Sequence, residues 1–198
     1  MDEKTAMDEL QFIKKVIEDS RRSMTYNGLD YIVWGIIVIV GLVLQYIAIL
    51  NQIYSNFLWT WAVLIPIGWI FSFTNGRRKK DRLPRTFSGK LIAAVWGATG
   101  FGMTLIGFVG LMSGAIKPWF ISPLLSVALG TGYFITGKIV ESRWISSLAL
   151  CWWLGAVIMF YYHGIYSILL MAIWMLCFQT IPGIMIYRKY KKEQEVKS

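Results

Sequence analysis

The sequence predicts an all-α polytopic membrane protein with six transmembrane helices, an N-terminal cytoplasmic amphipathic helix, and both chain ends in the cytoplasm. Three observations support this fold class. Hydrophobic residues make up 56% of the 198 residues and charged residues only 16%, against about 25% charged residues in ordinary globular proteins. The apolar residues gather in six long runs, and the basic residues gather in every second connection between those runs.

Residues 1–27 are expected to form the cytoplasmic amphipathic helix. Within residues 2–24, apolar side chains recur at helical spacing, and charges of both signs cover the other face. Because the acidic and basic residues nearly balance there, the segment differs from a polybasic lipid-binding arm. We expect it to pack on the cytoplasmic face of its own bundle or on a neighbouring chain.

The transmembrane bundle is predicted over residues 28–187. Its six apolar segments cover residues 29–50, 57–75, 88–112, 119–138, 144–162 and 165–187. At a rise of about 1.5 Å per residue, each segment can cross a hydrocarbon core about 30 Å thick. A segment in lipid must satisfy its own backbone hydrogen bonds, so all six are predicted to be helices. Residues 188–198 follow as a basic cytoplasmic tail.

The distribution of Lys and Arg predicts the orientation. All 20 of these residues except Lys117 lie on one side, namely before the first span, around the connections after the second and fourth spans, and after the last span. Such an excess marks the cytoplasmic side of a membrane protein. The net charge of +9 therefore reflects topology, and we expect no nucleic-acid partner.

The stretch DELQFIKKVIEDSRRSMTYNGLDYIVWGIIVIVGL, residues 8–42, combines a charged amphipathic segment with a first span that contains a Trp-Gly step. In this segment the chain resembles a group of small bacterial six-helix inner-membrane proteins of unassigned function. The resemblance implies a multi-pass protein of the bacterial cytoplasmic (inner) membrane. It brings no catalytic residues, because none are established for that group.

Motifs that would indicate an enzyme or a metal site are missing from the sequence. The stretch from Gly132 to Ile139 matches GxxxxGK, but it lies in an apolar span and ends in Ile where a phosphate-binding loop needs Ser or Thr. The two cysteines lie in apolar runs, and His163 is the single histidine. We therefore expect no metal, no cofactor and no catalytic residues, and an intramembrane enzyme ranks third among the functions considered.

A few polar or helix-breaking residues at the span ends and within the spans are the candidate ligand-binding residues. Ionisable residues near membrane depth are functional candidates by default, although salt bridges that fix helix ends are the preferred explanation for the charged ones. Pro182 leaves a backbone carbonyl one turn earlier without its helical donor, next to a polar amide. The candidates are Asp30, Glu141, Arg143, Gln179 and Pro182.

The third span, residues 88–112, is rich in glycine and alanine. Small residues let helices approach closely in lipid, so we expect this span to pack tightly in the bundle. It also offers a contact surface for a homodimer, as does the apolar stripe of the N-terminal segment. The deep tryptophans are expected to fill space in the bundle or to face lipid; the alternative is that some line an apolar pocket.

Two functions remain open from the sequence. The first is a carrier, channel or binding protein for a small or apolar ligand. The second is a membrane scaffold or regulatory subunit that acts through its cytoplasmic helix and basic loops. The expected partners are membrane lipid, a second copy of the chain, and a protein at the cytoplasmic face.

Overall fold

The computed structural model describes residues 7, 9–11, 28–53, 57–82 and 87–195. Throughout these residues the chain forms helices joined by turns, and it forms no strands. Six helical stretches are long and apolar enough to cross a membrane, which confirms the predicted all-α, multi-pass class. The expected amphipathic helix over residues 1–27 lies outside the described residues, apart from residues 7 and 9–11.

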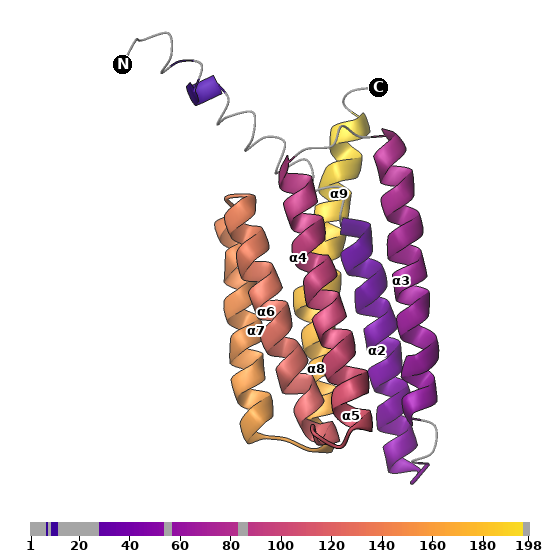
Figure 1. Cartoon of the computed structure of the whole chain (residues 1–198). Helices are drawn as coiled ribbons and strands as arrows, with labels where there is room; N and C mark the ends of the chain where they lie inside the picture. The colour runs from indigo at the N-terminus through magenta and orange to yellow at the C-terminus, as the bar shows by residue number, and fades with distance from the viewer. Residues whose placement is uncertain (1–6, 8, 12–27, 54–56, 83–86, 196–198) are drawn as a thin grey trace.

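The six spans follow one another as antiparallel helices (Figure 1). Their boundaries agree with the predicted segments, except that the second and sixth spans continue as helix into basic sequence, where Lys and Arg are good helix formers. The elements are α2 (Gly28–Leu50); α3 (Phe57–Arg82); α4 (Phe87–Thr104), the π-helix η1 (Leu105–Val109) and α5 (Gly110–Met112); the 3₁₀ turn η2 (Pro118–Phe120) and α6 (Ile121–Ile139); α7 (Arg143–Tyr161); and α8 (Ile165–Met175), the π-helix η3 (Leu176–Thr180) and α9 (Ile181–Glu195).

The start of α2 and the end of α9 lie at the same end of the bundle (Figure 1). We call this the basic end, because α3 finishes there, the α6–α7 turn lies there, and α9 leaves the bundle there with Arg188 and Lys189. The opposite end carries the α2–α3 and α7–α8 connections and Lys117. An even number of spans produces this arrangement.

The buried core lies between α2, α6, α7 and the sixth span, which together contain nearly all of the buried hydrophobic residues. The α6–α7 hairpin is especially close, because Gly137 faces the backbone of Ser146 with no room for a Cβ. Helices α3 and α4 are peripheral, and α4 buries only Ser88 and Ile92. The residues at the centre of the bundle therefore come from four of the six spans, with a smaller contribution from α4.

Tryptophan rings seated on glycines join neighbouring helices. The α2–α3 pair has two such contacts in opposite directions, with Trp34 on Gly68 and Trp61 on Gly41. Both indoles are also hydrogen-bonded across the pair, from Trp34 Nε1 to Ser72 Oγ (2.8 Å) and from Trp61 Nε1 to Gln45 Oε1 (3.1 Å). A Cβ on either glycine would come within 3 Å of the ring, so these glycines are needed for the close approach.

The same contact recurs in the second half of the chain. Trp153 lies on Gly130 and Trp174 lies on Gly155, and Trp174 Nε1 also donates to the backbone carbonyl of Cys151 at 2.9 Å. These two rings fill the space between spans four, five and six. The expected packing role of the deep tryptophans is therefore confirmed for Trp153 and Trp174.

The prediction that the glycines of the third span pack tightly within the bundle is wrong for several of them. A Cβ added at Gly97, Gly102, Gly107 or Gly114 would meet nothing within 4 Å. The span approaches α6 through larger side chains, because its inward face carries Ile92, Trp96 and Met103 rather than glycine. Small residues permit a close helix crossing, but they do not require one.

Candidate functional site

Four aromatic side chains from four different spans meet inside the bundle. They are Tyr31 of α2, Trp96 of α4, Tyr133 of α6 and Trp152 of α7, and we call them the aromatic cluster. Tyr31 and Tyr133 are stacked with their ring centroids 5.7 Å apart, and Trp96 stands edge-on to both at 5.1 and 5.2 Å. Trp152 is also stacked with Tyr133, with the ring centroids 6.4 Å apart. Tyr133 is the ring that joins all of the others.

The aromatic cluster carries polar atoms that are only partly satisfied. The hydroxyl of Tyr133 donates a short hydrogen bond of 2.6 Å to Gln179 Oε1. Among the residues that the structure describes, four other buried polar atoms in this region have no partner. They are Tyr31 Oη, Trp96 Nε1, Trp152 Nε1, and Oγ1 of Thr136, which lies one helical turn after Tyr133.

These unpaired atoms are deeply buried. Tyr133, Thr136 and Trp152 are 0% exposed, and Tyr31 is 4% exposed. A buried polar group without a partner costs about 1–3 kcal/mol, and native proteins contain few of them. Indole N–H groups only donate, whereas the tyrosine and threonine hydroxyls can both donate and accept. The cluster can therefore offer at least three donors and one amide acceptor to a guest molecule.

A π-helical turn places the polar residues of the sixth span against the cluster. Pro182 has no backbone N–H to bond the carbonyl of Phe178, and the preceding residues widen into the π-helix η3. Gln179 and Thr180 are both buried in this turn, and Thr180 Oγ1 donates to the carbonyl of Met175 at 3.1 Å. Short π-helices often occur at functional sites.

Glycines hold the first span closely against the sixth. Gly35 of α2 lies against the Thr180 side chain, and an added Cβ would collide with Thr180 Oγ1. Gly183 of α9 lies against Tyr31 and Ile32, where an added Cβ would be 2.8 Å from the Cβ of Tyr31. The position of Tyr31 in the cluster is thus fixed by η3 and α9 as well as by its own helix.

The structure brings part of the predicted site together. Gln179 contacts the aromatic cluster, and Pro182 is buried directly after η3. Asp30 precedes Tyr31, and its Oδ1 accepts a hydrogen bond of 2.8 Å from Asn75 Nδ2 of α3.

The other two predicted residues, Glu141 and Arg143, lie in or beside the α6–α7 turn at the basic end, and both are exposed. Glu141 has a positive φ of 50° and occupies the position after the helix end where glycine is common. Since neither side chain reaches the aromatic cluster, the five predicted residues do not form one site in this structure.

The two tyrosines and Thr136 are the functional candidates that sequence reasoning missed. Tyr31 was overlooked beside the charged Asp30. Tyr133 and Thr136 stand three residues apart, on one face of the fourth span. That spacing of two polar groups in an apolar helix is the signal that could have identified them.

Within the described ranges, no three His, Cys, Asp or Glu residues lie together in a group that could hold a metal ion. Comparison of the chain with protein-family models, curated proteins and solved structures found no match.

Proposed function

We propose that the chain is a membrane-embedded binding protein or carrier for a small neutral ligand, which is held in the aromatic cluster. The observation that carries this proposal is the group of four buried polar atoms without partners, all of them in or beside the cluster. A bundle whose only task is helix packing gains nothing from leaving them unpaired, because each one lowers stability. A ligand with hydrogen-bond acceptors would satisfy the indole and hydroxyl donors.

The chemistry of the cluster supports a neutral ligand. Its groups are two phenols, two indoles, a threonine hydroxyl and the Gln179 amide, and none of them carries a charge. An unpaired charge is expensive to bury in an apolar environment. A neutral molecule with a flat apolar body and two or three acceptor atoms matches ring faces combined with N–H and O–H donors.

Ligand entry requires the rings to separate, since they are in contact with one another. The π-helical turn η3 of the sixth span interrupts the helix beside the cluster, because it contains Gln179. A π-turn is one of the few places at which a helix can bend sharply. Movement of η3 would carry Gln179 away from Tyr133 and open the cluster.

The proposed orientation follows the distribution of Lys and Arg. We place the basic end in the cytoplasm and the protein in the inner membrane of a bacterium, in keeping with the positive-inside rule and with the resemblance of residues 8–42. Fusing a reporter that is active only in the periplasm to the α7–α8 connection tests this orientation. Activity there agrees with it, and activity of the same reporter at the C-terminus would contradict it.

Native mass spectrometry from lipid nanodiscs tests the binding function. We expect the wild type to release a discrete non-lipid mass that is lost from Tyr31→Phe and Trp152→Phe, because each change removes one donor and keeps the ring or most of its area. Trp144→Phe is the matched control, because Trp144 is 41% exposed at the start of α7. A wild type that carries only lipid, or an unchanged mass after Trp152→Phe, counts against the proposal.

The scaffold function has one observation in its favour. Gly97, Gly102 and Gly107 have open space beside them, so a helix of a second copy could approach the third span there. Cysteine cross-linking at Ala98, which is exposed on this span, tests a homodimer in native membranes. An oligomer that forms without any bound non-lipid mass would favour the scaffold over the carrier.

A further inference from the structure

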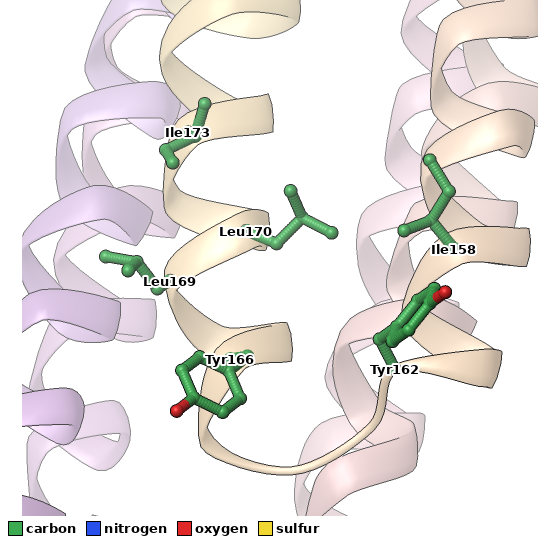
Figure 2. Close-up of a pocket in the computed structure, with 6 residues that line it drawn as sticks. All are labelled: Ile158, Tyr162, Tyr166, Leu169, Leu170 and Ile173. Carbon is green, nitrogen blue, oxygen red and sulfur yellow. The ribbon is translucent and has the colours of Figure 1, made fainter.

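An apolar groove runs along the outside of the bundle between α7 and α8 (Figure 2). Its volume is about 330 Å³, and its lining consists of Ile158, Tyr162, Tyr166, Leu169, Leu170 and Ile173. Ile158 and Leu170 point toward each other across the space between the two helices, while Tyr162 and Tyr166 flank the connection that joins them (Figure 2). The groove is therefore apolar along the two helices, and it carries two phenol groups at its mouth, the end where the helices are joined.

The groove lies at the depth of one membrane leaflet and opens near the surface of that leaflet. Its mouth lies at the opposite end of the bundle, where α7 ends at Tyr161 and α8 begins at Ile165. Tyr162 and Tyr166 are 71% and 73% exposed, as expected for rings in the interfacial belt of a membrane protein. From Tyr166 to Ile173 the groove follows α8 for about 10 Å, which is most of a leaflet about 15 Å thick.

Basic residues at the mouth give the groove a charge preference. Lys117 is the single Lys or Arg in the connections predicted to face away from the cytoplasm, and it opens the turn η2 by accepting the backbone N–H of Phe120 at 2.9 Å. The Phe120 ring packs against His163, with the ring centroids 5.7 Å apart, and His163 directly follows Tyr162. These contacts place His163 and the backbone of Lys117 at the same end of the bundle as the two phenols.

We propose that this groove is a binding site for an anionic phospholipid. One acyl chain lies between α7 and α8, and the headgroup phosphate lies beside Lys117 and His163. The apolar walls exclude a polar ligand from the length of the groove, and the exposed phenols can donate to ester or phosphate oxygens. This site is separate from the aromatic cluster and belongs to the surface of the bundle, so it can be occupied whether or not the cluster binds a ligand.

Lipid retention in native mass spectrometry tests the site directly. The protein is reconstituted in nanodiscs made from equal parts of phosphatidylglycerol and phosphatidylcholine, and the lipids that survive release are counted. We expect the wild type to keep one phosphatidylglycerol molecule preferentially. Leu170→Trp should lose it, because the larger ring fills the groove. Leu44→Trp is the control, because Leu44 is an exposed leucine on α2 (48%) that lies outside the groove.

The charge preference is tested by a second variant that leaves the groove open. Lys117→Gln combined with His163→Gln should still retain lipid but lower the ratio of phosphatidylglycerol to phosphatidylcholine by about fivefold, as expected when a basic residue beside an anionic headgroup is lost. Equal retention of the two lipids by the wild type would overturn the anionic preference. If Leu170→Trp retains phosphatidylglycerol at the wild-type level, the proposal that the lipid binds in the groove is overturned, even if that variant unfolds more easily.

Discussion

Replacing Thr136 with valine removes a hydroxyl group and keeps the shape of the side chain. Thr136 is 0% exposed in α6, and its Oγ1 has no partner among the described residues. Both residues are β-branched, so the helix tolerates them almost equally. Because an unpaired buried polar group costs about 1–3 kcal/mol, we expect Thr136→Val to raise the free energy of unfolding of the ligand-free protein by that amount. Most substitutions lower stability, so a gain of this size would be distinctive.

The assay is a titration with sodium dodecyl sulfate in mixed micelles, with helix content followed by circular dichroism. The protein is first unfolded and refolded in pure detergent, which removes any carried ligand. Thr131→Val is the matched control, since Thr131 lies on the same helix, is exposed, and donates to the carbonyl of Val127 at 3.1 Å. Its free energy of unfolding should stay within about 0.5 kcal/mol of the wild type.

The opposite sign would refute the reasoning. Suppose that Thr136→Val lowers the free energy of unfolding of the ligand-free protein by about 1 kcal/mol while Thr131→Val does not. The Thr136 hydroxyl then has a partner inside the protein, and the argument for a bound ligand fails. If the gain is observed, the same variant should lose the stabilisation that bound ligand gives to the wild type. The two measurements together separate an unsatisfied packing residue from a ligand-binding one.

For three further substitutions the structure fixes the direction in which the free energy of unfolding changes, and the same titration measures each change. Tyr133→Phe should lower the free energy of unfolding by about 1–3 kcal/mol, because it leaves the buried Gln179 Oε1 without its 2.6 Å donor; Tyr161→Phe, at a ring that is 80% exposed, should change nothing. Glu141→Gly should raise stability by about 1 kcal/mol, since the φ of 50° suits glycine better than any L-residue, and a loss would mean that the Glu141 side chain has a structural role. Gly35→Ala should destabilise by about 1–3 kcal/mol because the added Cβ collides with Thr180 Oγ1; Thr180→Ala in the same chain should restore part of this loss, and full additivity of the two changes would contradict the contact.

The fold class could be predicted because the bilayer imposes few solutions. A run of about 20 apolar residues in lipid must be a helix, so six runs predicted six spans, and their boundaries agree closely with the structure. Pro182 also indicated an irregular turn near Phe178, and the structure has the π-helix η3 there. How deeply each span is buried in the bundle was not predictable, because composition alone does not say which apolar face meets lipid and which meets protein.

The third span shows this limit clearly. Its glycines suggested a packing helix, but several have open space beside them, whereas Gly35, Gly137 and Gly183 in other spans make close contacts. The aromatic cluster could not be predicted for a related reason. Tyr31 and Tyr133 are about a hundred residues apart in the chain, and they stack only because their long side chains meet inside the bundle. Such a site depends on helix order around the bundle, which a periodicity of 3.6 residues does not encode.

The close contact between the first span and the last has a consequence for biosynthesis. Gly28 and Gly183 bring α2 against α9, where an added Cβ on Gly28 would lie 2.7 Å from the backbone nitrogen of Tyr187. A ribosome delivers α2 to the membrane long before α9, so this face of α2 waits in lipid until the chain is nearly finished. Completion of the bundle is therefore tied to the end of translation. The same proximity of Gly28 to Tyr187 would let a circularly permuted chain, reopened between α3 and α4, keep all six spans in their places.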